Sequence, residues 1–178
     1  GQGHYYNPEF LVKDKGKQTV EGYVTNITTD VAEDWLNKRD KSKPFCLVVG
    51  HKATHRVWLP DTHVLDDYTF PLPDNFYDNY KNRYAAQNQD MSIEKTMRLG
   101  YDLKIRPDDG SYNRLTPEQR AKFDAYYKPI EEDFLKRNLT GKALAEWKFQ
   151  RYMHDYVSTA VSLDNSIGEL MEYLDKNG

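Results

Sequence analysis

Cysteine is almost absent from the sequence, and so are long apolar runs. A single thiol, Cys46, cannot form a disulfide within the chain. Its position inside the apolar run 45–49 predicts that it packs as a small hydrophobic residue. That run is much shorter than the roughly 20 residues that cross a bilayer, so no membrane span is expected.

An excess of charge of one sign is lacking as well. The 25 basic residues nearly balance the 28 acidic ones, which leaves a formal net charge of -3. Such a chain has no large field that would gather polyanions, and nucleic acid is therefore not expected as a partner. With 38% hydrophobic and 13% aromatic residues, its 178 residues are typical of one globular domain or part of one.

The middle of the sequence predicts an α/β fold. Asp30, with Glu33 three residues later, forms a capping box that predicts a helix over residues 30–37. The continuous apolar run 45–49 predicts a strand that is covered on both faces, as in a parallel sheet. A helix, a short loop and a buried strand make up half of a doubly wound unit, in which a mainly parallel sheet is flanked by helices.

The two ends of the chain give further expectations. The first twenty residues, with a turn at Lys15-Gly16, indicate irregular or hairpin-like backbone. Thr116 and Pro117 predict the start of a helix. Apolar residues at three- and four-residue spacing predict a long C-terminal helix over about 142–174, closed by Asn177 and Gly178. We expect this helix to bury one apolar stripe against the sheet, formed by Tyr156, Leu163, Ile167, Leu170 and Leu174.

A cluster of polar side chains directly follows the predicted strand. His51, Lys52, His55 and Arg56 lie within six residues at the start of a long loop over 51–73. At the carboxyl edge of an α/β sheet such donors would face a ligand crevice, and an anionic tetrahedral group is their natural guest. Histidine donates a proton near neutral pH, so His51 and His55 are the acid candidates, and their spacing does not choose between them.

Other titratable residues are weaker candidates. His4, His63 and His154 are isolated from each other, and no HExxH or CxxC spacing occurs, so no metal site is expected within the chain. The acidic pairs are typical of solvated surface rather than of catalytic dyads. They are Asp66-Asp67, Asp108-Asp109 and Glu131-Glu132.

Two stretches of the sequence carry a family pattern. The first runs from 23 to 30 and continues through Trp35-Leu36 and 43–45 into 51–56, and the second covers 147–152 and 162–170. Together they resemble the formylglycine-dependent sulfatases, closest to the N-acetylglucosamine-6-sulfatase and mucin-desulfating branch. The second stretch is similar to the helix that precedes a calcium-binding strand in this family. The resemblance implies that residues 1–178 are an internal segment of an alkaline-phosphatase-like sulfatase catalytic domain.

The resemblance also implies a chemistry. These enzymes hydrolyse sulfate esters of sugars such as 6-O-sulfated N-acetylglucosamine in mucin or glycosaminoglycans, using calcium and a formylglycine nucleophile. His55 matches the family's loop histidine that protonates the leaving oxygen. His51, Lys52, Arg56 and Trp58 are the expected substrate-binding residues around it. The single cysteine does not indicate a cellular compartment, and the resemblance implies a periplasmic, secreted or lysosomal enzyme.

Departures from the family pattern limit what this chain can do alone. Thr54 stands where the family commonly has proline before the histidine, which would change the rigidity of the loop. No C/S-x-P-x-R nucleophile motif occurs, and the expected calcium carboxylates are absent. We therefore expect the nucleophile, the calcium ligands and the remainder of a sulfatase chain to lie outside these residues, and the segment alone to be inactive. The alternatives are an alkaline-phosphatase-like phosphodiesterase segment and a non-catalytic carbohydrate-binding or interaction module.

Overall fold

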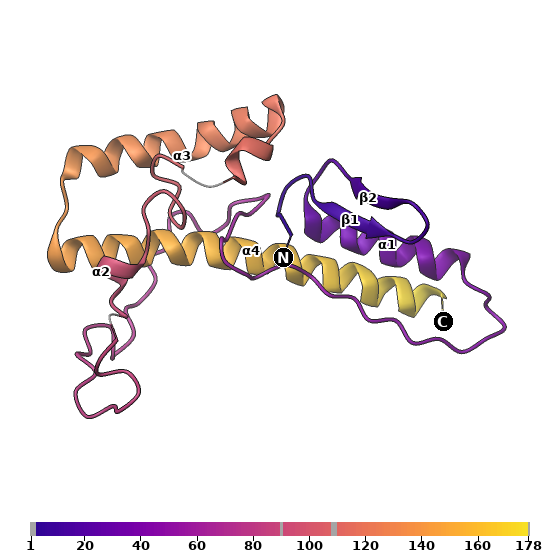
Figure 1. Ribbon diagram of the computed structural model, residues 1–178, viewed down its shortest axis with the longest axis horizontal. Helices are drawn as coiled ribbons and strands as arrows, with labels where there is room; N and C mark the ends of the chain where they lie inside the picture. The colour runs from indigo at the N-terminus through magenta and orange to yellow at the C-terminus, as the bar shows by residue number, and fades with distance from the viewer. Residues whose placement is uncertain (1–2, 90, 108–109, 178) are drawn as a thin grey trace.

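Helices dominate the structure, a computed structural model that describes residues 3–89, 91–107 and 110–177. Figure 1 shows the longest helix running through the molecule, with the N-terminal elements beside its C-terminal half. The helices are α1 (Val24–Lys38), α2 (Ile93–Thr96), α3 (Pro117–Arg137) and α4 (Gly141–Asn177), with a short 3-10 helix η1 (Tyr112–Arg114) and strands β1 (Glu9–Val12) and β2 (Gly16–Thr19).

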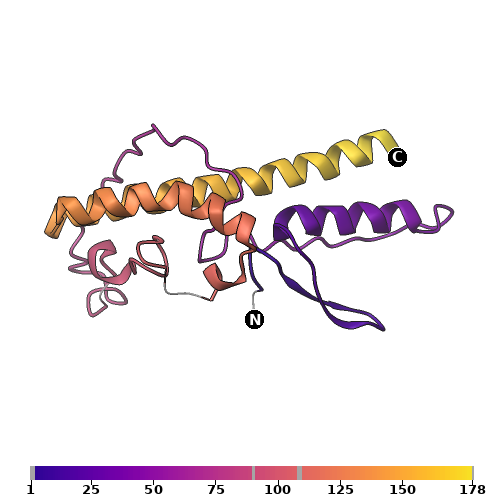
Figure 2. The same cartoon turned by 90° about the horizontal axis from the view of Figure 1, so that it is seen from above.

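The N-terminal residues form the hairpin that their turn residues predict. Strands β1 and β2 pair antiparallel, with Glu9 opposite Thr19 and Val12 opposite Gly16. Gly16 has a φ of 71°, in the left-handed region that glycine adopts without a steric penalty. The hairpin projects away from α4 in the view of Figure 2.

Helix α1 starts earlier than the sequence predicts. It begins at Val24, and Asp30, the predicted cap, lies exposed in its middle. The Thr-rich first turns are compatible with a helix because their hydroxyls bond back to the helix: Thr28 donates to the Val24 carbonyl (2.7 Å) and Thr29 to the Thr25 carbonyl (3.2 Å). The predicted capping box at Asp30 is therefore wrong.

The predicted strand over 45–49 is not formed among the described residues. This segment is a loop, in which Phe45 and Val48 are 41% and 89% exposed. A strand needs a neighbour for its backbone N–H and C=O groups. Among the described residues β1 pairs with β2 and Tyr6 forms an isolated bridge with Tyr23, whereas 45–49 pairs with neither. The mainly parallel sheet is thus not confirmed. The prediction that Cys46 packs as a small hydrophobic residue is wrong for the same reason, because the thiol is exposed.

The two C-terminal helices are confirmed and form a hairpin. Asn177, predicted to close the last helix, lies within α4, and Gly178 lies outside the described residues. Thr116 caps α3, as the sequence predicts, and the structure adds a capping box with Gln119. Asn138, in a left-handed conformation with φ 47°, ends α3, and α4 then runs back beside it (Figure 1). Within the described ranges, none of these helices combines the length and apolarity that crossing a bilayer requires.

The buried face of α4 differs from the predicted stripe. Ile167 and Leu174 are 48% and 39% exposed, and Tyr156, Leu163 and Leu170 are only partly buried. Apart from Phe149, the buried residues are instead small or charged, and they include Asp155, Ser158, Thr159, Ser162 and Ser166. Short polar side chains let the loop segment 61–64 approach α4 closely and bond to it. Ser158 Oγ accepts the Val64 N–H (3.0 Å), and the Ser162 hydroxyl donates to Asp61 (2.6 Å).

Two small apolar clusters join segments that are distant in sequence. Tyr5, Tyr23, Val24 and Leu59 form the first, which joins the N-terminus and the start of α1 to the histidine-containing loop over 51–73. The second consists of Leu103, Ile105 and Phe134 and packs the segment 103–105 against α3. The loop therefore lies between the N-terminal elements and the helical hairpin.

Candidate functional site

The backbone around His55 is fixed from two sides. The His55 N–H donates to the Lys52 carbonyl (2.9 Å), which closes a turn. The hydroxyl of the buried Tyr5 donates to the His55 carbonyl (2.6 Å). Because the backbone is held by groups from the loop and from the N-terminus, the exposed imidazole is presented on an anchored support.

The imidazole of His55 has one nitrogen engaged and one available. Nδ1 contacts the carbonyl oxygen of Arg56, which can only accept, so Nδ1 carries a proton and donates it. The hydrogen bond at one ring nitrogen sets the role of the other. Nε2 is thus the atom that would donate a proton to a ligand.

A cavity of about 400 Å³ opens beside this imidazole. Lys52, His55 and Arg56 line it, together with Tyr101 and Ser111 from another part of the chain. His4 lines it as well, so four side chains that carry or can carry a positive charge surround one space. Such a set suits an anionic group carrying oxygen atoms. The structure therefore brings three of the five predicted site residues together.

Lys52 is the cation of this cavity without a carboxylate partner among the described residues. Its ammonium lies 4.8 Å from the centroid of the Tyr5 ring, a cation–π contact. Partial burial lowers the pKa of Lys52, because desolvation disfavours the charged form. An anion entering the cavity would therefore meet a Lys52 ammonium that is partly desolvated and not paired with a carboxylate.

Arg56 has its charge already paired. Its Nε and one terminal nitrogen donate to the two carboxylate oxygens of Asp102, at 2.5 and 2.6 Å. The hydrogen bonds to Asp102 raise the pKa of Arg56. Asp102 is fully buried and was not singled out by the sequence, because 46 residues separate it from Arg56 and no local pattern connects them.

His51 and Trp58 lie outside the cavity. Burial lowers the pKa of His51, and neither of its ring nitrogens has a hydrogen-bond partner among the described residues. The Trp58 indole packs edge-on against Tyr152 with ring centroids 4.6 Å apart, and its Nε1 donates to the Thr54 carbonyl (3.0 Å). Their substrate-binding roles stay predictions, and in this structure Trp58 joins the loop to α4.

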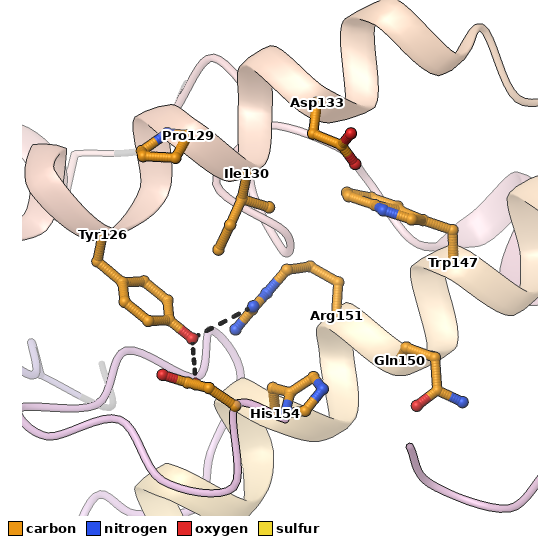
Figure 3. A pocket seen from close by; sticks show the side chains of 9 residues that line it. Tyr126, Pro129, Ile130, Asp133, Trp147, Gln150, Arg151 and His154 are labelled. Atoms are coloured by element: carbon orange, nitrogen blue, oxygen red, sulfur yellow. Dashed lines mark hydrogen bonds between the residues drawn. The ribbon is translucent and has the colours of Figure 1, made fainter. Parts of the chain in front are cut away.

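A second cavity, of about 470 Å³, lies between α3 and α4. Figure 3 shows Tyr126 and Ile130 of α3 facing Arg151 and His154 of α4, with Trp147 at one end. Although larger, this cavity has a weaker claim to bind an anion because Arg151 is already bound to the buried Asp155. It contains none of the five predicted site residues.

Apart from His4, which lines the cavity beside His55, the remaining titratable candidates are engaged elsewhere. The His63 ring stacks on Tyr126 with centroids 3.4 Å apart, and burial lowers its pKa to about 4. Asp66 accepts the Tyr126 hydroxyl (2.6 Å) and Glu131 accepts the Arg106 N–H (2.6 Å). The pair Asp108-Asp109 lies outside the described residues. Across the residues that are described, no three His, Cys, Asp or Glu side chains come together as a metal site.

The chain as a whole matches a known protein family. The family model described as Sulfatase matches residues 2–178, and the chain is a member of the sulfatase family.

Two relatives define the part of a sulfatase to which the chain corresponds. The chain is 40% identical over 193 residues to an N-acetylglucosamine-6-O-sulfatase of Bacteroides thetaiotaomicron, an alignment that covers 99% of this chain and 34% of that protein. Its structure matches the solved structure of BT4656 in complex with its substrate D-glucosamine-2-N,6-O-disulfate, with a TM-score of 0.92 at 39% identity. This match covers 99% of this chain and 39% of the other. The chain thus spans about a third of the length of its relatives.

Proposed function

We propose that the chain supplies part of the active site of a sulfuric ester hydrolase that removes sulfate from sulfated sugars. The observation that carries this is an exposed His55 beside Lys52 at one cavity, in a chain of the sulfatase family. The name of the Bacteroides relative supports 6-O-sulfated N-acetylglucosamine as the substrate. Family membership favours this function over a phosphodiesterase or a carbohydrate-binding module.

In the reaction, a bond between sulfur and the sugar oxygen breaks while a nucleophile bonds to sulfur. His55, as imidazolium, gives its Nε2 proton to the departing oxygen, which leaves as the sugar hydroxyl. Lys52 faces the sulfate oxygens and offsets their negative charge, a stabilisation that strengthens when water is excluded. These two roles need only the side chains that the cavity presents.

Calcium and a formylglycine nucleophile are the groups that the sulfatase family implies. The side chains that line the cavity are mostly hydrogen-bond donors, whereas calcium requires several oxygen ligands. The residues described here do not fit these groups, which we assign to other segments of a complete enzyme. In that enzyme we also propose that residues 45–49 join a mainly parallel sheet, because their apolar run suits coverage on both faces. Residues 1–178 would then be an internal part of its catalytic domain, and the enzyme periplasmic, secreted or lysosomal.

The test compares two leaving groups in the complete enzyme. His55→Ala should lower kcat on N-acetylglucosamine-6-sulfate by about 10²–10⁴-fold, the range for a lost general acid. The loss on an aryl sulfate should be much smaller, because a phenolate departs without protonation. His154→Gln, a histidine outside this cavity, serves as the matched control and should leave both rates unchanged. Equal losses of His55→Ala on both substrates would remove His55 from the acid role.

A further inference from the structure

The pair Arg56 and Asp102 has the geometry of a support rather than of a substrate site. Both carboxylate oxygens of Asp102 are occupied by the Arg56 guanidinium. One of them also accepts the Arg98 N–H at 2.8 Å. Asp102 itself is inaccessible to solvent, whereas the Arg56 side chain is 46% exposed. A two-pronged bond to a buried carboxylate fixes both the position and the orientation of the guanidinium.

Lys104 extends this support into the helical hairpin. Its buried ammonium donates to the Trp58 carbonyl, to the Asp102 carbonyl (2.8 Å) and to the Asp155 carboxylate of α4 (2.8 Å). Asp155 is held in turn by Arg151, the same side chain that reaches toward Tyr126 in Figure 3. The residues on the C-terminal side of His55 are therefore attached at Arg56 through a side chain and at Trp58 through the backbone.

The anchoring acts directly on the imidazole. The carbonyl that accepts the His55 Nδ1 proton is that of Arg56, so a displacement of Arg56 moves the acceptor that orients the ring. Asp102 also neutralises the charge of Arg56, so Arg56 should attract sulfate more weakly than Lys52 does. Lys52 has no carboxylate partner among the described residues.

We propose that Asp102 and Arg56 form a positioning pair that holds the His55 imidazole in its proton-donating orientation, and that Arg56 is not a sulfate ligand. The role of Asp102 depends on the proposed sulfatase function, because it acts through His55. This proposal changes the role of Arg56 from substrate binding to support. It also adds Asp102, which lies 46 positions away from Arg56 in sequence, to the residues that serve the reaction.

The first experiment measures coupling in the complete enzyme. Asp102→Asn keeps the volume of the side chain and removes its charge. It should lower kcat on N-acetylglucosamine-6-sulfate by about 10-fold to 100-fold, the cost of a misplaced catalytic group. The loss should be much smaller on an aryl sulfate, and Asp102→Asn should add little further loss in a His55→Ala background, because coupled residues act as a unit.

The second experiment tests Arg56 against Lys52 with inorganic sulfate as the probe. Arg56→Gln should keep the inhibition constant of sulfate within about threefold of the unsubstituted enzyme and lower kcat instead. Lys52→Gln should weaken sulfate inhibition by about 10-fold or more. If Arg56→Gln weakened sulfate inhibition as much as Lys52→Gln, Arg56 would be a sulfate ligand and the assignment would be overturned.

Controls separate the possible failures. Asp78→Asn removes a more exposed Arg–Asp pair, that of Arg83 and Asp78 at 2.6 Å, which does not line the cavity of His55, and should leave both rates unchanged. Thermal unfolding of each variant checks that it folds. Losses from Asp102→Asn that are equal on both substrates and additive with His55→Ala would overturn positioning. An enzyme in which His55→Ala itself has no effect would instead refute the proposed function.

Discussion

Asp155, like Asp102, is a charged residue enclosed completely by the surrounding protein. Its carboxylate is fully buried and contacts Lys104, Arg151 and the Tyr127 hydroxyl. Burial alone would raise the pKa of Asp155, but the two cations outweigh it and hold the pKa below its ordinary value. A buried carboxylate with these three partners keeps its charge and joins α3, α4 and the segment around Lys104.

Removing one partner of this group should be costly. Lys104→Met should lower the free energy of unfolding by about 3–5 kcal/mol, since it leaves Asp155 with less compensation in a buried site. Urea denaturation measures the change. The double variant Lys104→Met with Asp155→Asn should lose less than the sum of the two single losses. A loss from Lys104→Met below about 1 kcal/mol would show that Arg151 and Tyr127 suffice for Asp155.

His63 should make stability depend on pH. Its pKa is about 4 in the folded chain because burial disfavours the imidazolium, against an ordinary value of 6.5. Between these two values the unfolded chain binds more protons, so stability should fall as the pH is lowered from 6.5 toward 4. Asp155, with a lowered pKa, loses its contribution only below its ordinary value of 3.8.

The measurement is the midpoint of thermal unfolding at pH 7 and at pH 4.5. His63→Phe, which keeps an aromatic ring against Tyr126, should reduce the difference between the two pH values relative to the unsubstituted chain. An unchanged difference would mean that the other partly buried histidines, His51 and His154, account for it.

At the scale of single residues, the sequence predicts the side chains that line the cavity but not the residues that hold them in place. Lys52, His55 and Arg56 are close in sequence and line one cavity, so their clustering could be recognised. Asp102 and Lys104 reach the same loop across 46 residues each, a proximity that depends on the complete fold. Trp58, by contrast, is adjacent in sequence and packs away from the cavity.

Helix α3 offers the clearest test at the scale of an element. The Thr116 hydroxyl accepts the Gln119 N–H (3.3 Å), and the Gln119 side chain accepts the Thr116 N–H (2.9 Å). Thr116→Ala should therefore cost about 0.5–2 kcal/mol of stability, measured by urea denaturation. Thr69→Ala, at an exposed threonine in a loop, is the matched control and should change stability by less than about 0.5 kcal/mol. Equal effects of the two substitutions would contradict the cap.

Local patterns predict these elements unequally. Helices α3 and α4 follow their caps and periodicity because those features act within a few residues. The start of α1 is missed because Thr25, Thr28 and Thr29 suggest non-helical backbone, although two of their hydroxyls are satisfied inside the helix. The apolar run 45–49 predicts a strand, yet pairing requires a partner strand that the described residues do not offer.

Over the whole molecule, several large apolar side chains are exposed on α4, on α1 and in the loop that follows α1. Met171 is 56% exposed, Val31 60% and Val48 89%. Apolar surface of this kind commonly marks an interface. It accords with a chain that spans about a third of its relatives' length.

The thiol of Cys46 reports on this surface. In the 178-residue chain it should react rapidly with a disulfide reagent such as DTNB, because it is exposed. In the complete enzyme the thiol should react at least about tenfold more slowly, since a strand at 45–49 would be covered on both faces. Equally rapid reaction in both would contradict the proposed sheet position of residues 45–49.

The reactivity of two buried lysines can report whether the molecule is folded. Lys104 and Lys148 are 4% and 5% exposed, and the Lys148 ammonium donates to the carbonyls of Glu94 and Met97. An amine-acylating reagent modifies free, accessible ammonium groups first, so these two would stay unmodified while the surface lysines are labelled. Mass spectrometry of the labelled peptides would then distinguish opening around Lys148, where α2 meets α4, from release of the histidine loop at Lys104.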